Sequence, residues 1–476
     1  MRASDWEAKA CQQKEQKLDH STSALPLAST KQLFLDSPIV DSLVGVRLVL
    51  NSANKFSGNP TLVADRPWEG RMVFLNGTVL WDEDEKVFKM WYQAAYGNEE
   101  SLVCYALSKD GKSWDKPALN SVSYGGNTRN NIVLRNFGKG DIWHPSVIKD
   151  SQDPDPSKRY KMIYWNEPKP RQNNPWAAVC AAFSSDGIRW QNALGNPIWS
   201  GVPPGDVLNC IYDQERSVYL LFHREYPHGK RVVALSESTD FLHWSPRGII
   251  VSPEATDPEW LQFYGMSGFR YEDTYVGFLW NYNARSDLET IDIRLTTSRD
   301  GITWKRILPE SVFLSLGEER RFDGGMVFTA NHPIIVGEEI FVYYGGWACR
   351  HDVVPPTRAA IGLATLRRDG FVGLAAGEKE GTLTTKPFTF EGDELILNAE
   401  SAQGLVEAAL LHPDGTPLSG FNRSDCFPLN ANGLSSRVQW KRNPSFSPLQ
   451  GKPIRLKFYL QNAKLYCFQF RRGQKS

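Results

Sequence analysis

Four acidic residues in this chain share one local setting. Each stands just before an apolar run with the composition of a β-strand, and the four are Glu69, Asp141, Asp206 and Asp323. Cleavage of a glycosidic bond needs one carboxylic acid to protonate the leaving oxygen and one carboxylate to act as nucleophile or base. The four acids are therefore candidate catalytic residues, provided that the fold brings them together. A turn cap or a salt bridge is the structural alternative for each.

Seven further residues near the same segments are candidates for binding a substrate. They are Trp68, His144, His223, Arg224, Gln262, Tyr264 and Arg321. His144 follows Asp141 by three residues, while Gln262 and Tyr264 stand in a segment, QFYGMSGF, that lacks an acid. Imidazole and guanidinium groups can bind hydroxyls, or hold a carboxylate or phosphate in its charged form. The alternative for the histidines and arginines is a structural hydrogen bond or ion pair.

The elements that would position these residues recur along the chain. The hairpin sequence YALSKDGKSW (105–114) returns as AAFSSDGIRW (181–190) and LTTSRDGITW (295–304). Looser copies are VALSESTDFLHW (233–244), with a longer predicted turn, and IGLATLRRDGF (361–371). Asp-Gly suits a tight turn because Gly accepts positive φ and Asp hydrogen-bonds nearby backbone amides. The Trp that follows is large enough to seal one repeat against the next.

A continuous apolar strand precedes each hairpin. The five segments are FKMWYQ (88–93), YKMIYW (160–165), VYLLFH (218–223), YVGFLW (275–280) and IFVYYG (340–345). Such runs are typical of strands buried between neighbouring sheets. Five pairs of strand and hairpin predict a five-bladed β-propeller, in which the starts of the innermost strands converge on one pocket.

The repeats end near Phe371, and the chain then changes its pattern. Residues 377–476 contain strand-like segments separated by the turn sequences PDG, EGD and NANG, which predict a β-sandwich. Residues 1–30 are polar and charged, which predicts a poorly ordered segment. The predicted chain is therefore all-β, with an N-terminal segment (1–30), a catalytic propeller (31–376) and an accessory sandwich (377–476).

Composition narrows the classes of partner and cofactor. The chain has 54 basic and 54 acidic residues, so no strong field would attract nucleic acid or an anionic membrane. Sixteen Trp and 17 Tyr favour a carbohydrate partner, because sugar rings stack on aromatic faces. The seven cysteines form no CxxC pair and no histidine cluster has zinc spacing, so we expect reduced thiols and neither metal nor cofactor. The polar N-terminus predicts a cytoplasmic protein, or a periplasmic or secreted one if a leader was removed.

Seven segments together resemble a known group of proteins. They are LFLDSPIVDSLVGV, RPWE, FKMWYQ, SKDGKSW, HPSVIKD, FDGGM and IGLATLRRDGF. They are similar to uncharacterised bacterial glycosidase-like proteins of the five-bladed propeller superfamily, which includes invertases, levanases, arabinanases and mannoside phosphorylases. The resemblance implies a glycoside hydrolase acting on an oligosaccharide or glycoside, with acids at the starts of inner strands. The invertase signatures WMNDPNG and RDP are absent, so no nucleophile is carried over.

Two alternatives to hydrolysis stay open at this point. A phosphorylase of the same fold would use the arginines for phosphate, and a non-catalytic propeller would bind carbohydrate or a protein. The hairpin sequence is also similar to the Asp box of sialidases, but those have six blades and an arginine triad. WD40 scaffolds have shorter repeats with GH and WD dipeptides. The acids at the starts of inner strands favour an enzyme, while the sugar, linkage, stereochemistry and oligomeric state stay open.

Overall fold

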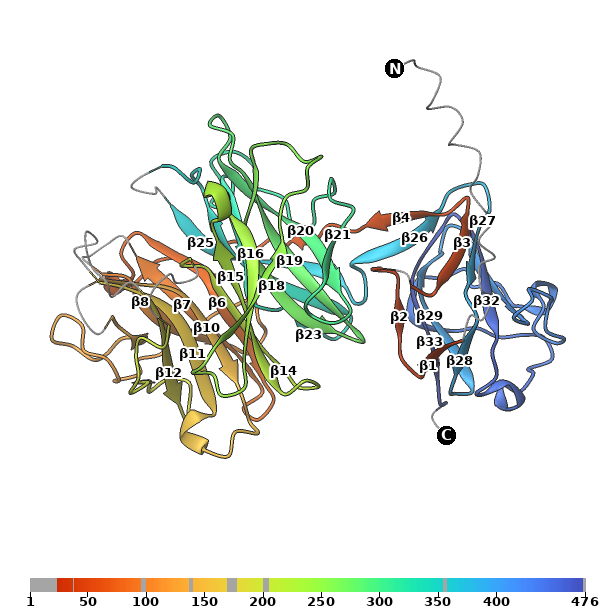
Figure 1. The fold of residues 1–476 in the computed structure, drawn as a ribbon, viewed down its shortest axis with the longest axis horizontal. Helices are drawn as coiled ribbons and strands as arrows, with labels where there is room; N and C mark the ends of the chain where they lie inside the picture. The colour runs from red at the N-terminus through yellow and green to blue at the C-terminus, as the bar shows by residue number, and fades with distance from the viewer. Residues whose placement is uncertain are drawn as a thin grey trace, which may run out of the picture. The chain divides into compact units, whose positions relative to one another are not determined.

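The computed structural model describes residues 24–36, 38–95, 100–136, 140–168, 178–199, 205–353 and 358–473. Within these ranges the chain is all-β, with short 3-10 turns between strands (Figure 1). None of the described helices is long and apolar enough to cross a membrane. The chain forms two compact units. We call Lys31–Asp36 with Leu48–Leu374 the repeat unit, and the described parts of Met1–Thr30, Ser37–Arg47 and Ala375–Ser476 the C-terminal unit.

The repeat unit begins with three four-stranded antiparallel sheets in chain order. The first contains β6 (Met72–Asp82), β7 (Val87–Ala95), β8 (Leu102–Ser108) and β9 (Ile132–Leu134). The second contains β10 (Gly140–Lys149), β11 (Tyr160–Pro168), β12 (Ala178–Ser184) and β13 (Gln191–Asn192). The third contains β14 (Leu208–Asp213), β15 (Val218–Glu225), β16 (Val232–Ser238) and β17 (Ser245–Val251). Each therefore repeats the predicted order of strand and hairpin.

The next two groups of strands share one larger sheet. The fourth group is β18 (Leu261–Tyr271), β19 (Thr274–Asn283), β20 (Thr290–Ser298) and β21 (Trp304–Ile307). The fifth is β22 (Met326–Thr329), β23 (Ile334–Val336), β24 (Glu339–Trp347), β25 (Ala359–Arg367) and β5 (Asn54–Lys55). The groups are joined where Ile291 pairs with Met326. Because β5 pairs with β25, a segment from early in the chain completes the last group.

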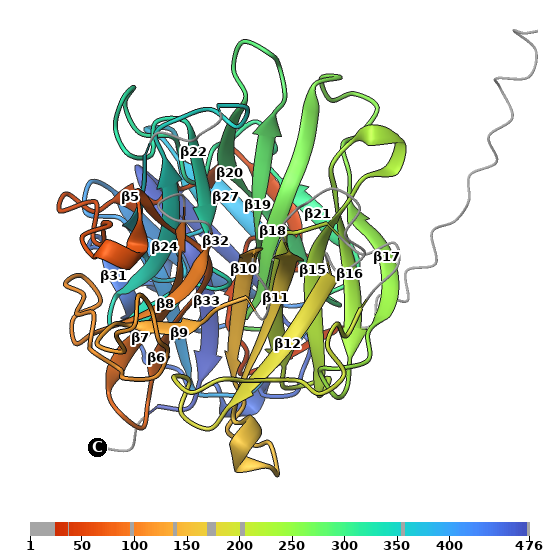
Figure 2. The same ribbon diagram turned by 90° about the vertical axis from the view of Figure 1, so that its left-hand side faces the viewer.

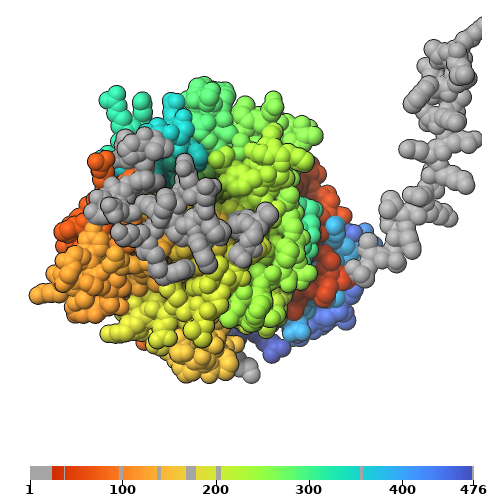
Figure 3. All heavy atoms as spheres, turned by 60° about the vertical axis from the view of Figure 1, so that its left-hand side comes forward, coloured from red at the N-terminus to blue at the C-terminus, as the bar shows by residue number. Residues whose placement is uncertain are grey.

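The first strands of the five groups contact one another in a closed series. β6 contacts β10, β10 contacts β14, and β14 contacts β18. In the fifth group, β22 contacts β6 and β20, and its Thr329 is hydrogen-bonded to Ser267 on β18. Figure 2 shows the groups following one another around a centre, and the colours in Figure 3 run in the same order around one face. The start of every first strand is therefore brought towards one region.

Buried hydrogen bonds link these first strands at their middles. The bonded residues are Thr78–Val147, Ser146–Cys210, Asn209–Met266, Ser267–Thr329 and Asn331–Thr78. The side chains that make these bonds are buried. An unsatisfied buried polar group costs about 1–3 kcal/mol, so shifting one group against its neighbour would be unfavourable. The bonds thus fix how far each first strand is shifted along its length relative to the next.

The predicted hairpin turn is built with the same bonds four times. In the first copy, the Gly111 N–H donates to Ser108 Oγ (2.8 Å), and Asp110 Oδ1 accepts from the Lys112 and Ser113 N–H groups (both 2.8 Å). Equivalent bonds occur around Asp186, Asp240 and Asp300. The copy at 233–244 does not have the longer turn that we predicted. There Phe241 takes the glycine position at φ 68°, and the bonding pattern is kept.

The C-terminal unit contains two antiparallel arrays of strands. One is β3 (Val40–Val44), β27 (Gly381–Thr385), β32 (Arg455–Gln461) and β30 (Leu405–Leu411). The other includes β31 (Gly433–Arg437), β29 (Glu394–Glu400) and β33 (Ala463–Arg471). A separate two-stranded sheet pairs β1 (Leu25–Ala28) with β28 (Phe388–Phe390). Phe458 on β32 contacts Phe468 on β33, with ring centroids 5.6 Å apart. Because β3 pairs with β27, residues 40–44 belong with this unit, whereas the sequence analysis placed them with the propeller.

Candidate functional site

A cavity of about 280 Å³ lies where the starts of the first strands meet. All five groups contribute to its wall: Phe74 and Asn76 from β6, Trp143 and His144 from β10, Asp206 before β14, Tyr264 from β18, and Met326 and Phe328 from β22. The chain from the end of β24 onward adds Trp347, Cys349, Arg350, His351 and Val353. The convergence expected from the repeats is therefore present at this cavity.

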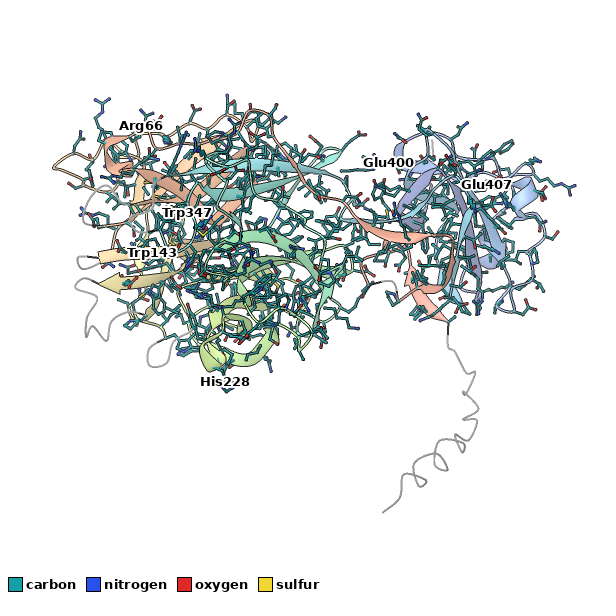
Figure 4. The ribbon with its side chains drawn as sticks, turned by 90° about the horizontal axis from the view of Figure 1, so that it is seen from above. Arg66, Trp143, His228, Trp347, Glu400 and Glu407 are labelled. Carbon is teal, nitrogen blue, oxygen red and sulfur yellow. The ribbon has the colours of Figure 1, made fainter. Side chains whose placement is uncertain are left out.

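Aromatic rings form much of the wall. The centroid of the Phe74 ring lies 4.9 Å from that of Trp347 and 6.1 Å from that of Trp143. Figure 4 shows Trp143 and Trp347 close together within the repeat unit. The indole Nε1 of Trp143 donates to Glu167 Oε2 on β11 at 2.9 Å. A carboxylate thus holds the ring of Trp143 in place.

Asp206 is the one of the four predicted acids that lines the cavity. It forms an ion pair with Arg224, which ends β15; the Asp206 side chain is 30% exposed and that of Arg224 is 5% exposed. The guanidinium also lies 4.4 Å from the ring centroid of Tyr264. Burial acts to lower the pKa of Arg224, but Asp206 together with Tyr264 and Tyr226 outweighs burial, so the pKa of Arg224 is raised. A permanent cation beside Asp206 favours a carboxylate at that position.

His144 reaches the cavity through an irregularity in β10. The register with β11 shifts between Trp143 and Ser146, and His144 has φ 50°. Gln93 secures this bulge, because its Oε1 accepts from the His144 N–H (2.9 Å) and its Nε2 donates to the Ile142 carbonyl (2.7 Å). Bulges re-aim side chains, and a non-glycine residue at positive φ needs such support.

The imidazole of His144 is uncharged at neutral pH. Burial lowers its pKa to about 4; Asp206 acts in the opposite direction, and Arg224 adds to the lowering. His144 is 4% exposed, and its Nδ1 has no hydrogen-bond partner among the described residues. A neutral ring with a free nitrogen can bind a hydroxyl of a ligand.

A chain of polar groups leads from the cavity towards Glu289. The Tyr264 hydroxyl lies 3.2 Å from His351 Nε2, and His351 Nδ1 lies 3.4 Å from the Tyr282 hydroxyl. Tyr282 donates to Glu289. Sequence reasoning missed His351, Arg350 and Trp347, which follow or end a second strand. In an antiparallel pair, the end of the second strand lies beside the start of the first. The residues at and after the end of each second strand could therefore have been recognised as site candidates.

Glu69 and Trp68 belong to a buried network outside the cavity. The 3-10 turn η1 (Pro67–Glu69) places the Glu69 carboxylate where it accepts from the Asp65 and Arg66 N–H groups (2.8 and 2.9 Å). Tyr92 and Lys116 also contact this carboxylate, at 2.6 and 2.7 Å. Trp68 Nε1 donates to Asn131. Neither residue is part of the cavity wall.

Asp323 and Asp141 also lie outside the cavity wall. Asp323 is 3% exposed and accepts from Lys55 Nζ (2.6 Å) and the Tyr344 hydroxyl (2.8 Å). Burial lowers the pKa of Lys55, although Asp323 acts against this. Asp141 lies two residues before Trp143 and accepts from the Ser101 N–H at 2.9 Å. It is half-buried, and so nearer to solvent than Asp323.

Three other predicted binding residues do not line the cavity either. His223 is 1% exposed; its Nε2 lies 3.0 Å from Ser236 Oγ, and burial lowers its pKa to about 4. Gln262 accepts from Arg231 Nη1 at 2.9 Å. Arg321 is exposed before β22. The structure therefore brings together Asp206, His144 and Tyr264, with Arg224 directly behind them.

A second cavity, of about 590 Å³, lies at the opposite ends of the first strands. Leu80, Ile148, Ile211 and Arg270 are in its wall. None of its described lining side chains has a buried polar atom without a partner, whereas Asn76 and His144 in the first cavity do. The first cavity is therefore the better candidate for a polar ligand.

Metal ligands are not clustered in the described part of the chain. There, no group of three His, Cys, Asp or Glu residues could hold a metal ion. The six described cysteines, Cys104, Cys180, Cys210, Cys349, Cys426 and Cys467, are free thiols; Cys11 lies outside the described residues.

No protein-family model matches the sequence, and no curated protein matches it. Among solved structures, the chain is similar to a thermostable family-43 glycoside hydrolase, with 13% identity, a TM-score of 0.47, and coverage of 64% of this chain and 94% of that one. It is also similar to the β-1,2-mannobiose phosphorylase from Listeria innocua (10% identity, TM-score 0.47, coverage 67% and 97%). A third similar structure is an N-acetylgalactosamine deacetylase from F. plautii (15% identity, TM-score 0.41, coverage 73% and 97%). Similarities of this size do not identify a reaction or a substrate.

Proposed function

We propose that this chain is a glycoside hydrolase, built on a five-bladed β-propeller with a C-terminal β-sandwich, and that it acts at the first cavity. The contacts of β6 with β10, β10 with β14, β14 with β18 and β22 with β6, together with the hydrogen bond between Thr329 on β22 and Ser267 on β18, support five blades. The ring contact between Phe458 and Phe468, which lie in different arrays of the C-terminal unit, supports a sandwich.

The ion pair of Asp206 with Arg224 on an aromatic-lined cavity carries the proposal. Ligand sites are concave and mostly apolar, with a few convergent polar groups. Trp143 and Trp347 offer faces on which a sugar ring can stack. Asp206, His144 and Tyr264 then supply the polar contacts that would orient it. The combination suits a sugar better than a purely apolar ligand.

Within this site, Asp206 is assigned the role of base or nucleophile. Its neighbour Arg224 favours the charged carboxylate that either role needs. The general acid is then assigned to Asp141, which lies opposite Glu167 in the pairing of β10 with β11. Glu167 in turn binds Trp143 in the cavity wall.

Release of reducing sugar from a panel of glycosides and oligosaccharides tests this assignment. Asp206→Asn should lower turnover at least about a hundredfold, since losing a positioned acid or base typically costs 10² to 10⁴ in rate. The matched control is Glu83→Gln, whose side chain is 73% exposed and pairs with Lys86. Full activity in Asp206→Asn would contradict the assignment.

Phosphorolysis is the second candidate, because Arg224 and Arg231 both lie over the Tyr264 ring and Arg350 lines the cavity. Guanidinium groups bind phosphate well. Formation of a sugar 1-phosphate only when inorganic phosphate is present would select this reaction over hydrolysis. Sugar binding without any cleavage would instead select a non-catalytic carbohydrate-binding propeller.

A further inference from the structure

Two arginines behind the cavity wall, Arg224, which is buried, and Arg231, which is half-buried, have only one described acid between them. The guanidinium carbons of Arg224 and Arg231 lie 4.4 and 5.6 Å from the centroid of the Tyr264 ring, and Arg231 is also 5.0 Å from that of Tyr282. Arg224 pairs with Asp206. Arg231 donates to the neutral amide oxygen of Gln262, and none of the described acids lies within ion-pair distance of it. The two cations are therefore incompletely balanced.

Several N–H groups of these arginines have no acceptor. Nε and Nη1 of Arg224 and Nε of Arg231 are buried and have no hydrogen-bond partner among the described residues. Arg224 as a whole is 4% exposed. Leaving a buried donor of a charged group unpaired costs free energy. Three such donors near one tyrosine ring therefore indicate that a bound ligand supplies an acceptor.

The cavity wall also carries unpaired polar atoms on uncharged side chains. Asn76 Oδ1 and His144 Nδ1 are buried and have no described partner. Both residues line the same cavity as Asp206 and Tyr264, which Arg224 contacts. These neutral atoms suit hydroxyl groups. The atoms that suit hydroxyls therefore lie in the wall of the cavity of about 280 Å³, and the two cations that suit an anion lie directly behind that wall, against Asp206 and Tyr264.

The electrostatics at His351 agree with an excess of positive charge. Burial lowers the pKa of its imidazole, and Arg231 and Arg224 add to this effect against Glu289 and Asp206. The outcome is a lowered pKa, although Glu289 Oε2 lies only 3.9 Å from the ring.

We propose that the sugar bound in this cavity carries a carboxylate, so that the substrate is a glycoside of a uronic acid. The carboxylate would accept hydrogen bonds from Arg224 and Arg231, because the planar guanidinium fork matches its two oxygens. Asn76 Oδ1 and His144 Nδ1 would form hydrogen bonds with hydroxyl groups of the sugar ring. Attachment of the anion to the sugar is favoured because Asp206 and Tyr264, which Arg224 contacts, line the same small cavity as Asn76 and His144. The inference rests on the proposed action on glycosides.

Calorimetric binding to the full chain tests this inference with matched sugar pairs. The pairs are D-glucuronate with D-glucose, D-galacturonate with D-galactose, and D-mannuronate with D-mannose, and inorganic phosphate is a separate probe. At least one uronate should bind about tenfold more tightly than its hexose, a preference of about 1.4 kcal/mol. Arg231→Gln should abolish this preference, and Arg231→Lys should keep part of it. Arg270→Gln, in the wall of the second cavity, is the matched control and should leave it intact.

Each other result overturns the inference and has a separate meaning for the proposed function. If a hexose binds as tightly as its uronate, or only neutral glycosides are cleaved, the carboxylate is wrong while the glycoside function stands. If phosphate alone binds in an Arg231-dependent way, the cations serve phosphate and the function is phosphorolysis. If no sugar binds and none of the neutral or acidic glycosides is cleaved, the proposed function fails as well.

Discussion

Arg224 lies behind Asp206 as an almost fully buried cation, with 5% of its side chain exposed against 30% for the acid. The carboxylate therefore faces the cavity while its counter-ion is held in the protein. A charge kept in a low-dielectric setting by a rigid partner loses little solvation when a substrate covers it. This arrangement makes Asp206 the centre of the proposed site.

Replacing Gln93 tests whether the bulge in β10 positions His144. Gln93→Met should lower turnover about tenfold or more, because the His144 N–H loses its acceptor and the Ile142 carbonyl loses one of its two side-chain donors. Stability should fall by about 1–3 kcal/mol. Steady-state kinetics and thermal unfolding measure the two effects.

Gln450→Met is the control for that experiment. It removes a side-chain bond to the Gly392 carbonyl (2.8 Å) in the C-terminal unit. A smaller loss of stability is expected, because Gln450 is exposed and Gln93 is buried, and turnover should be unchanged. If Gln93→Met affects turnover no more than Gln450→Met does, Gln93 is structural only.

Stability should fall as the pH is lowered from about 6.5 towards 4. Burial lowers the pKa of His223 to about 4 in the folded protein, whereas its ordinary value is 6.5. Between these values the unfolded chain binds a proton that the folded protein refuses, so acid favours unfolding. His144 behaves in the same way. Melting temperature against pH should therefore show a decline within this window.

The substitution His223→Gln should make that decline shallower, because it removes one of the histidines whose pKa is lowered by burial. His243→Gln is the matched control, since the His243 side chain is 89% exposed. A decline that is equally steep in the parent and in His223→Gln would show that other groups cause it.

Acids of the C-terminal unit should not take part in the reaction. Glu391, Asp393 and Asp425 are the acids there that come nearest to a cluster in the sequence. The structure pairs Glu391 with Arg472 at 3.7 Å and uses Asp393 to accept from the Gly473 N–H. Replacing each by Ala should change kcat less than about twofold, and a hundredfold loss in any of them would place it in the active site.

The sequence predicted the repeats and the convergence of the first strands better than it predicted individual acids. The turn motif depends on bonds within a few residues, so its spacing can be read directly, as around Asp110. Asp206 was found because the start of a first strand is a position fixed by topology. Phe241 shows the limit, because a residue at φ 68° can replace glycine when the surrounding bonds hold it.

The ion pairs of Glu69 and Asp323 could not be predicted from local sequence. Lys116 lies 47 residues from Glu69, and Lys55 lies 268 residues from Asp323. Only the folding of each group of strands brings these lysines to the acids. His351 was missed for a related reason, because it follows the end of β24 and reaches the cavity from the far end of a different strand.

The most direct test of the account compares four amide variants on a glycoside that the parent cleaves. They are Glu69→Gln, Asp141→Asn, Asp206→Asn and Asp323→Asn. Asp206→Asn and Asp141→Asn should each lower kcat about a hundredfold or more with a nearly unchanged melting temperature, because these carboxylates are assigned to the chemistry. Glu69→Gln and Asp323→Asn should lower the melting temperature, because Lys55 loses its acid and Lys116 loses its buried acid while keeping the exposed Asp65. Near-normal kcat in a well-folded Asp206→Asn variant would contradict the account and place the reaction outside this cavity.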